Sequence, residues 1–200
     1  MKKIHNTKLP SIFMVLGIVL IILSVTMVVF SEISEKKSIE KTHSIVGELK
    51  TLMPKSTNCA PDYRTNTVMP ILEIKNTDFI GIIEIPAFNT ALPIHSEWST
   101  SEISQYPCRY MGSVYDNTLI IGGNDSKGQF DFIETISNGD TVTVTDVTGM
   151  RFTFSVTDIR KTKDVSTENL TSKDNDLVLF ARNAFAFDYT VIRCDFKTGI

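Results

Sequence analysis

The chain has 200 residues, of which 42% are apolar and 22% are charged, and its formal net charge at neutral pH is -3. This length predicts about one compact domain and a smaller segment, since one domain per roughly 150 residues is a reasonable expectation. The residues after position 30 carry 17 basic and 23 acidic side chains. This acidic balance excludes a nucleic-acid partner, because binding to a phosphate backbone requires clustered Lys and Arg side chains.

An uncharged segment, Ser11 to Phe30, contains 16 apolar residues out of 20. A helix of this length spans about 30 Å, the thickness of the hydrocarbon core of a bilayer, so residues 11–30 are predicted to form a transmembrane anchor. A cleaved signal peptide is the competing interpretation, but it has an apolar region of only about 7–15 residues and a small-x-small cleavage site. The sequence SEISE at positions 31–35 has no such site, which favours a retained anchor.

The charges that flank this segment predict its orientation. Lys2, Lys3 and Lys8 precede it without any acidic residue, whereas Glu and Lys are mixed after it. Because positive residues remain on the cytoplasmic side, the tail of residues 1–10 is predicted to be cytoplasmic and the C-terminal domain extracellular. We therefore expect a single-pass protein of the cell membrane, and the short Lys-rich tail suits a bacterial cell surface.

Residues 31–77 are predicted to connect the anchor to the domain. Apolar residues such as Ile39, Ile45 and Leu49 recur with a roughly helical period as far as about residue 53, which predicts a stalk helix. Prolines at positions 54, 61 and 70, among many Thr and Asn residues, then predict a linker.

Residues 78–200 are rich in strand patterns. The runs that predict strands are residues 79–86, 117–123, 141–145, 152–156, 177–181 and 190–194. Gly149 separates two alternating runs and predicts a hairpin turn. Only short helices are expected, over Ser101–Gln105 and Phe130–Ile136. The predicted fold is mainly β, a closed or half-closed antiparallel roll of seven or eight strands.

Several motifs in this region carry a resemblance to a known family. They are GIIEIP at 81–86, LPI at 92–94, PCRYMGS at 107–113, TLII at 118–121 and Gly-Asp at 139–140. In this order they resemble the sortases, the membrane-anchored cysteine transpeptidases of the Gram-positive cell surface, over about residues 78–196. The third motif is similar to a clostridial branch related to classes B and D. The resemblance implies an eight-stranded β-barrel with short helices, and neither a cofactor nor a metal is expected.

Sortase chemistry uses a His to handle protons, a Cys thiolate to attack a peptide carbonyl, and an Arg to bind the substrate and the oxyanion. In the run IGGNDSKGQF at 121–130, the resemblance places Asn124 at the His position. In LVLFAR at 177–182 it places Arg182 at the Cys position, and in YTVIRC at 189–194 it places Tyr189 at the Arg position. A four-residue shift of the last run would put Arg193 there instead, but it would break the strand match.

These replacements predict a pseudo-sortase. An amide cannot exchange a proton near neutral pH, and a guanidinium is always charged and cannot attack a carbonyl. We therefore predict that the protein acts by binding a peptide or protein, with Asn124, Arg182 and Tyr189 in its groove. Its partners would be the membrane and a surface-protein peptide, an active sortase or another membrane protein. The alternatives are an active cysteine transpeptidase or peptidase with a shifted site, or a product of gene decay, which the intact strand alternation disfavours.

The shifted site would need one of the other cysteines. Cys59, Cys108 and Cys194 form no C-x-x-C pair, so neither a zinc site nor a thioredoxin-like motif is indicated, and one disulfide with a third free thiol fits the sequence. Cys108 and Cys194 are interpreted as small buried residues or half of a disulfide. His95 is interpreted as a surface or hydrogen-bonded histidine rather than a catalytic one.

Four other residues of the site region have plain structural interpretations. Arg182 can form an ion pair with an acid such as Asp188 instead of binding a ligand. Asp125 and Asp131 lack the ligand spacing of a calcium loop and are interpreted as loop residues. Trp98 is interpreted as a packing and hydrogen-bonding residue.

Overall fold

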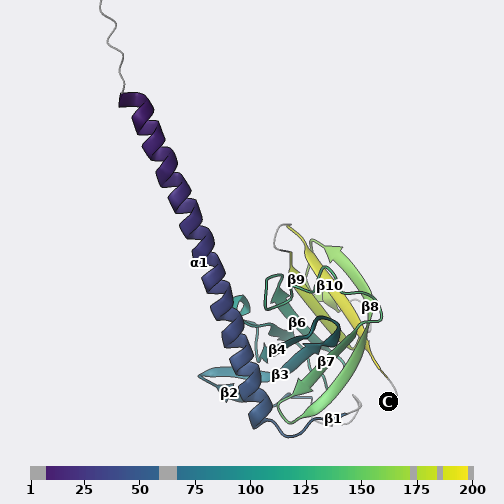
Figure 1. Cartoon of the computed structure of the whole chain (residues 1–200). Helices are drawn as coiled ribbons and strands as arrows, with labels where there is room; N and C mark the ends of the chain where they lie inside the picture. The colour runs from purple at the N-terminus through teal and green to yellow at the C-terminus, as the bar shows by residue number, and fades with distance from the viewer. Residues whose placement is uncertain (1–7, 59–66, 172–174, 184–186, 198–200) are drawn as a thin grey trace, which may run out of the picture. The chain divides into compact units, whose positions relative to one another are not determined.

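The computed structural model describes residues 8–58, 67–171, 175–183 and 187–197 (Figure 1). Its elements are α1 (Lys8–Leu52), β1 (Thr57–Asn58), β2 (Leu72–Ile74), β3 (Thr77–Ile85), η2 (Pro86–Phe88), β4 (Thr90–His95), η3 (Glu102–Ser104), β5 (Cys108–Met111), β6 (Leu119–Asn124), β7 (Thr141–Asp146), β8 (Met150–Thr162), α2 (Thr167–Leu170), β9 (Leu177–Arg182) and β10 (Tyr189–Phe196). The chain divides into two compact units, Met1–Ser38 and Ile39–Ile200.

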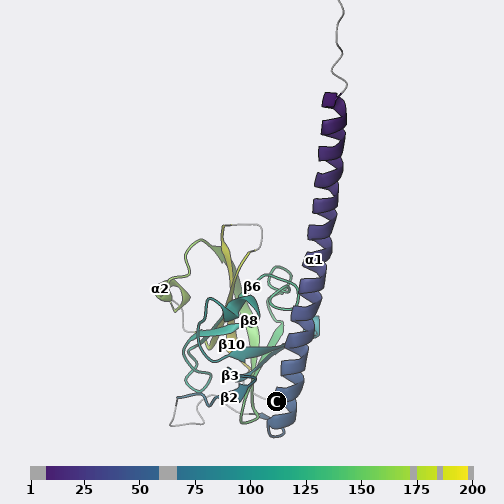
Figure 2. The same cartoon turned by 90° about the vertical axis from the view of Figure 1, so that its left-hand side faces the viewer.

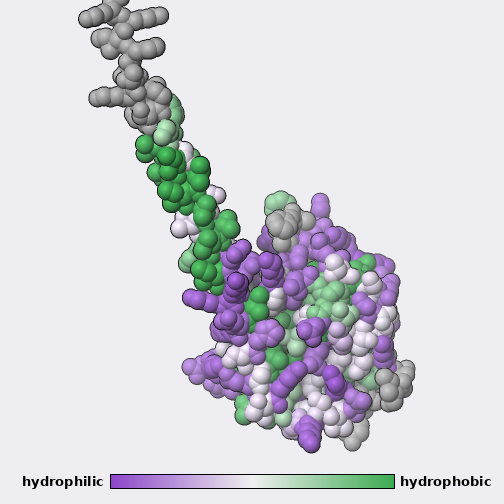
Figure 3. Space-filling model, viewed as in Figure 1, coloured by the Kyte–Doolittle hydropathy of each residue, from purple (hydrophilic) through white to green (hydrophobic). Residues whose placement is uncertain are grey.

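The first unit contains the N-terminal part of α1. Its large apolar side chains are exposed along the helix, as at Leu23 and Phe30, and Figure 3 shows a nearly continuous apolar surface there. Within the described residues this is the one helix long and apolar enough to cross a membrane. The finding is consistent with a single-pass membrane anchor.

The second unit is built around a closed barrel. Its strands pair in the order β8-β10-β9-β6-β5-β4-β3, and β7 closes the ring by pairing with both β3 and β8. Strands β1 and β2 extend this sheet at β8 and β3. The predicted eight-stranded β-barrel with few helices is therefore confirmed, and so is the β7–β8 hairpin, whose turn contains Gly149 with a φ of 81°.

The barrel differs from the predicted antiparallel roll in two places. Strand β6 runs parallel to β9, and β4 runs parallel to β5 at a single residue pair. Parallel neighbours need a crossover of about a dozen residues or more. The chain supplies these crossovers with the β7–β8 hairpin and with residues 96–107, and local sequence patterns do not reveal such pairing.

The helices inside the barrel domain also differ from expectation. In the segment 130–136, predicted to be helical, residues 130–135 form consecutive turns, and the N–H of Ile133 donates to the carbonyl of Phe130 at 2.9 Å. The side chains of Phe130, Phe132 and Ile133 are all buried, so they do not form the single apolar stripe of a surface helix. The predicted helix at Ser101–Gln105 is the short 3-10 helix η3, and α2 was not predicted.

The C-terminal part of α1 belongs to the second unit. Ile45 and Leu49 are buried in one cluster with Phe79, Ile82 and Tyr106. Figures 1 and 2 show this part of the helix alongside the barrel, whereas α2 lies on another side. Burying these side chains removes apolar surface from water, so the compact unit begins at Ile39 and includes residues that the sequence assigned to a stalk and linker.

Candidate functional site

Asn124, Arg182 and Tyr189 lie on three neighbouring strands of the barrel. Asn124 is the last residue of β6 and pairs with Arg182, the last residue of β9. Arg182 in turn pairs with Tyr189, the first residue of β10. Because residues directly opposite each other project to the same face of a sheet, the structure brings all three into one row at one end of the barrel. We call these three residues the strand-end row.

The alternation of side chains along β9 determines which way the row faces. Leu177, Leu179 and Ala181 are fully buried in the barrel core. Phe180 and Arg182 therefore lie on the opposite, outer face, because successive side chains of a strand point to opposite sides. Arg182 is exposed to solvent, while Asn124 and Tyr189 are half-buried.

The Asn124 side chain is held by hydrogen bonds to the loop before β5. Its Nδ2 donates to the carbonyl of Ile103 at 2.9 Å, and Nε2 of Gln129 donates to the same oxygen at 2.9 Å. The Oε1 atom of Gln129 accepts from the backbone N–H of Asn124 at 3.0 Å. The amide of Asn124 thus anchors η3 to the end of β6. It offers no group that titrates near neutral pH.

Arg182 is a solvent-exposed cation at the centre of the row. No carboxylate of the described residues lies within ion-pairing distance of its guanidinium. The ion pair with Asp188 that the sequence allowed is not formed, and the Asp188 carboxylate instead accepts a hydrogen bond from Nδ2 of Asn183. An exposed guanidinium keeps its planar set of N–H donors available for a carboxylate or a peptide carbonyl.

Asn183, which the sequence interpretation did not single out, closes the end of the β9–β10 pair. Its side chain is buried, and its Oδ1 accepts from Oγ1 of Thr190 at 2.9 Å. Its backbone N–H donates to the carbonyl of Asp188 at 3.1 Å. Its position directly after the strand was the only sequence signal, since Asn is common at turns.

Aromatic side chains cover the outer face beside the row. Trp98 stacks on Phe180 with ring centroids 5.7 Å apart, and Tyr110 contacts both rings edge-on at 5.3 and 5.4 Å. The ring centroid of Phe180 lies 6.5 Å from that of Tyr189, which is a member of the strand-end row. The predicted packing role of Trp98 is present here, but the rest of this cluster was not foreseen, because its members come from four separate segments. We call these four residues the aromatic cluster.

Gly122 makes the packing of Trp98 possible. A Cβ atom at this position would lie 2.4 Å from the Trp98 ring and 2.6 Å from the Phe180 ring. The absence of a side chain therefore lets the indole lie directly on β6. Trp98 is still 40% exposed, so the aromatic cluster presents a surface to solvent.

Neither described cysteine is placed as a reactive thiol. Cys108 and Cys194 are free and fully buried. Burial raises the pKa of Cys108 to about 11 and also raises the pKa of Cys194. A thiol is nucleophilic as its thiolate, so these pKa values oppose reactivity near neutral pH. Cys59 lies outside the described residues, so a disulfide between Cys59 and another cysteine stays a prediction.

His95 and Cys108 are backbone partners in the short β4–β5 pair. The Nδ1 atom of His95, however, lies 2.7 Å from the carbonyl of Glu97, and Sγ of Cys108 donates to the carbonyl of Tyr106 at 3.4 Å. Each side chain thus has a backbone partner of its own.

Arg193 occupies a different position from the strand-end row. It pairs with Val178, four residues along β9 from Arg182, which corresponds to roughly 13 Å. Its guanidinium is buried, and Nη2 donates to the carbonyl of Asn169 in α2 at 2.8 Å. Desolvation on burial lowers its pKa. Arg193 therefore packs beneath α2 and does not belong to the strand-end row.

The side chains that could ligate a metal are scattered over the described part of the molecule. Within the described ranges, no three His, Cys, Asp or Glu side chains gather closely enough to hold a metal ion. Asp131 accepts a hydrogen bond from the backbone N–H of Gly128 at 3.4 Å, as a loop residue does.

Comparison with known proteins identifies the class to which this closed barrel belongs. Residues 83–189 match the family model of the Sortase domain, which is more than half of the chain, so the chain belongs to the sortase family. No curated protein sequence matches it.

Solved structures of sortases share this fold. Sortase C1 from Streptococcus suis aligns with a TM-score of 0.53 and 17% identity, over 61% of this chain and 74% of that one. The pilus-related sortase C of Group B Streptococcus aligns with a TM-score of 0.52 and 15% identity, over 82% of this chain and 91% of that one. Sortase C from Clostridium perfringens SM101 aligns with a TM-score of 0.50 and 16% identity, over 83% of this chain and 89% of that one.

Proposed function

We propose that this protein is a pseudo-sortase that binds a peptide or protein segment without cleaving it. The supporting observation is the strand-end row itself. An amide, a guanidinium and a phenol stand there, at the positions where the motif match expects the His, Cys and Arg of the family. None of the three side chains is a thiol, so none can form the thioester intermediate of the family.

The same row has the chemistry of a recognition site. Arg182 can donate paired hydrogen bonds to a carboxylate or a peptide carbonyl. The aromatic cluster next to it offers apolar surface for a neighbouring side chain of the bound segment. The preferred ligand is therefore an extended peptide that places an acidic group beside an apolar or aromatic side chain.

We also propose that the apolar helix anchors the chain with residues 1–10 in the cytoplasm, residues 11–30 in the membrane and the barrel outside. The lysines before the apolar segment support this orientation. Residues 31–77 would then connect the anchor to the domain of residues 78–200. In this arrangement the row meets segments of surface proteins or of other membrane proteins, which are the partners that we propose.

An active cysteine transpeptidase with a shifted site is the second candidate. The backbone pairing of His95 with Cys108 is the observation that favours it. The burial of the Cys108 thiol, the raised pKa of that thiol and the separate partner of His95 oppose it. We therefore keep it as the alternative that the experiment must exclude.

The test uses the full chain in detergent micelles and an array of peptides from the C-terminal sorting regions of surface proteins. We expect several peptides to bind, with affinities that fall about tenfold in Arg182→Gln and do not change in Lys163→Gln, a matched change at an exposed lysine outside the row. No peptide should be cleaved or captured as a hydroxylamine-sensitive thioester. Restoring the nucleophile alone with Arg182→Cys should also give no turnover, because its thiolate would lack a His partner.

Two results would overturn the proposal. Cleavage that stops when Cys108 or Cys194 is replaced by Ala would establish the transpeptidase alternative. Equal peptide affinity in the native chain, Arg182→Gln and Lys163→Gln would show that the strand-end row does not bind the peptide.

A further inference from the structure

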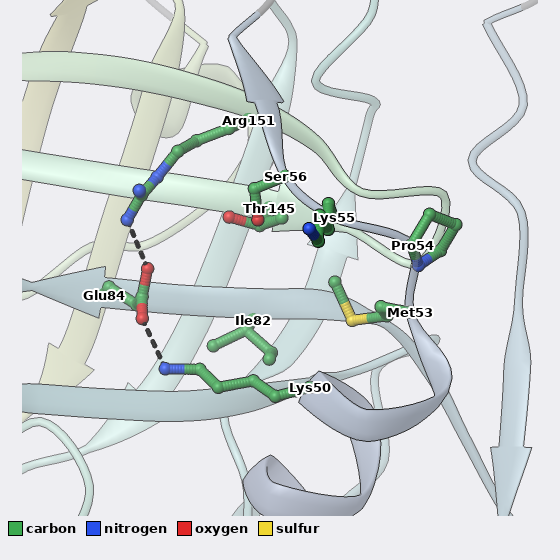
Figure 4. Close-up of a pocket in the computed structure, with 9 residues that line it drawn as sticks. All are labelled: Lys50, Met53, Pro54, Lys55, Ser56, Ile82, Glu84, Thr145 and Arg151. Carbon is green, nitrogen blue, oxygen red and sulfur yellow. Dashed lines mark hydrogen bonds and ion pairs between the residues drawn. The ribbon is translucent and has the colours of Figure 1, made fainter.

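A cavity of about 320 Å³ lies where the end of α1 meets the barrel (Figure 4). Its lining residues are Lys50, Met53, Pro54, Lys55, Ser56, Ile82, Glu84, Thr145 and Arg151. All of them belong to the unit Ile39–Ile200, and none belongs to the strand-end row. The volume falls in the lower range of small-molecule sites, which typically combine apolar walls with a few converging polar groups.

The charges around the cavity do not balance. Glu84 is the one acidic residue of the lining, and it accepts hydrogen bonds from Nζ of Lys50 and Nη2 of Arg151, both at 2.7 Å. Lys55 adds a third cation. In Figure 4 these three basic side chains approach the cavity from different sides. With one carboxylate against three cations, the lining carries an excess of two positive charges.

Glu84 remains ionised at neutral pH. Burial by itself would raise its pKa, but the hydrogen bonds and charges of Lys50 and Arg151 outweigh burial and lower the pKa below the ordinary value of 4.5. The Glu84 carboxylate therefore offsets one of the three basic side chains of the lining and leaves the other two unbalanced.

The lining is rich in hydrogen-bond donors. Arg151 uses Nη2 for Glu84 and keeps the other N–H groups of its guanidinium, while Lys55 carries three N–H donors. The hydroxyls of Ser56 and Thr145 add two more. A phosphate monoester has a charge of about -1.5 to -2 at pH 7 and three strong acceptor oxygens, whereas a carboxylate carries one charge and two oxygens. The phosphate is the better match to this cavity in both charge and donors.

We propose that this cavity binds a phosphate monoester, with the phosphate between Arg151 and Lys55. The organic part of the ligand packs against the apolar side chains of Met53, Pro54 and Ile82. Because α1 supplies Lys50 and the residues directly after it supply Met53, while the barrel supplies Ile82, Glu84 and Arg151, the bound ligand fastens the end of the helix to the barrel. This site does not depend on the peptide-binding proposal.

Calorimetric titration of the full chain in detergent micelles with inorganic phosphate tests this site. We expect binding that is weakened at least fivefold in Lys55→Gln and in Arg151→Gln, and that is unchanged in Lys163→Gln. Lys55 has no hydrogen bond or ion pair to another described residue, so Lys55→Gln should fold normally, and thermal melting checks this for each variant. Affinity should also fall between pH 8 and pH 5.5, because inorganic phosphate loses its second charge near pH 7, while the lowered pKa of Glu84 keeps that carboxylate ionised over this range.

Two further probes distinguish the source of the phosphate group. Glycerol 3-phosphate represents a soluble ester, and nanodiscs containing phosphatidic acid represent a lipid headgroup, with phosphatidylcholine nanodiscs as the reference. Binding of either probe that depends on Lys55 supports the site and identifies its source. The proposal fails if inorganic phosphate does not bind at millimolar concentration, or binds equally well to all three variants.

Discussion

Strand β9 has two faces that differ in burial and in chemistry. On the inner face, Leu177, Leu179 and Ala181 are fully buried in the barrel core. On the outer face, burial decreases along the strand, from Val178 and Phe180, which are buried, to Arg182, which is exposed. The comparison shows that a strand can keep its place in the barrel through one face while its other face and its end carry different chemistry. A well-formed barrel is therefore no evidence that this member of the sortase family is catalytically active.

The largest expected effect comes from the inner face. Leu179→Ala should lower the free energy of unfolding by about 2–5 kcal/mol, because it removes apolar contacts and leaves a cavity in a packed core. Denaturant unfolding of the full chain in micelles measures this. Leu52→Ala, at an exposed position near the end of α1, is the control and should change stability by less than about 0.5 kcal/mol. Similar effects of the two changes would contradict the assignment of β9 to the core.

The alkylation rate of Cys108 tests how well this buried thiol is shielded from solvent. With the pKa of Cys108 at about 11, the thiolate fraction at pH 8 is roughly two orders of magnitude below that of an ordinary cysteine. Iodoacetamide should therefore label Cys108 at least a hundredfold more slowly in the folded chain than in urea, as followed by peptide mass spectrometry. Rapid labelling of the folded chain would show that Cys108 is a reactive thiol.

The same thiol predicts a sign for the pH dependence of stability. Its pKa is higher in the folded state than its ordinary value of about 9, so the folded state holds the proton more tightly. The stability contribution is fully present below pH 9 and is lost as the pH rises towards 11, because the unfolded chain ionises first. Cys108→Ala should remove this part of the alkaline loss, and an unchanged alkaline profile in that variant would contradict it.

A smaller effect is expected at the outer face of β6. Gly122→Ala places a Cβ against Trp98 and Phe180, so we expect a loss of about 1–3 kcal/mol and displacement of the indole. Because Trp98 is the single tryptophan of the chain, its fluorescence reports this displacement directly. The control is Gly47→Ala, where a Cβ meets nothing within 4 Å, and it should be neutral or slightly stabilising. An unshifted spectrum in Gly122→Ala would argue against direct packing of Trp98 on β6.

The smallest effect on stability is expected at the strand-end row. Arg182→Gln should change the free energy of unfolding by less than about 0.5 kcal/mol, because the guanidinium is exposed and has no ion pair within the described residues. Denaturant unfolding in parallel with the peptide array separates the two roles of this residue. A loss above about 1 kcal/mol would mean that Arg182 is part of the packing rather than of a binding surface.

The sequence predicted a mainly β domain because strand signals are local, and the family resemblance carried by the order of its motifs implied the eight-stranded barrel. The uncharged Ser11–Phe30 segment, the alternating strands and the turn at Gly149 each depend on neighbouring residues, and the order of the motifs predicted the family. The sequence also selected Asn124, Arg182 and Tyr189 as positions of one site, by motif matching. The match could not indicate which side chains would surround them, since those come from other segments.

What the sequence by itself determined is the mainly β character of residues 78–200, the six strands β3, β6, β7, β8, β9 and β10, and the apolar N-terminal segment. The tertiary structure decided the parallel pairing of β6 with β9, which brings Asn124 and Arg182 into one row, and the packing of Trp98 on Gly122. It also decided which partners the apolar residues Ile45 and Leu49 of α1 find, since they pack against Phe79 and Ile82. The physical reason is that alternation and turn residues act over a few positions along the chain. Pairing between distant segments depends on which buried faces fit together once the whole barrel has closed.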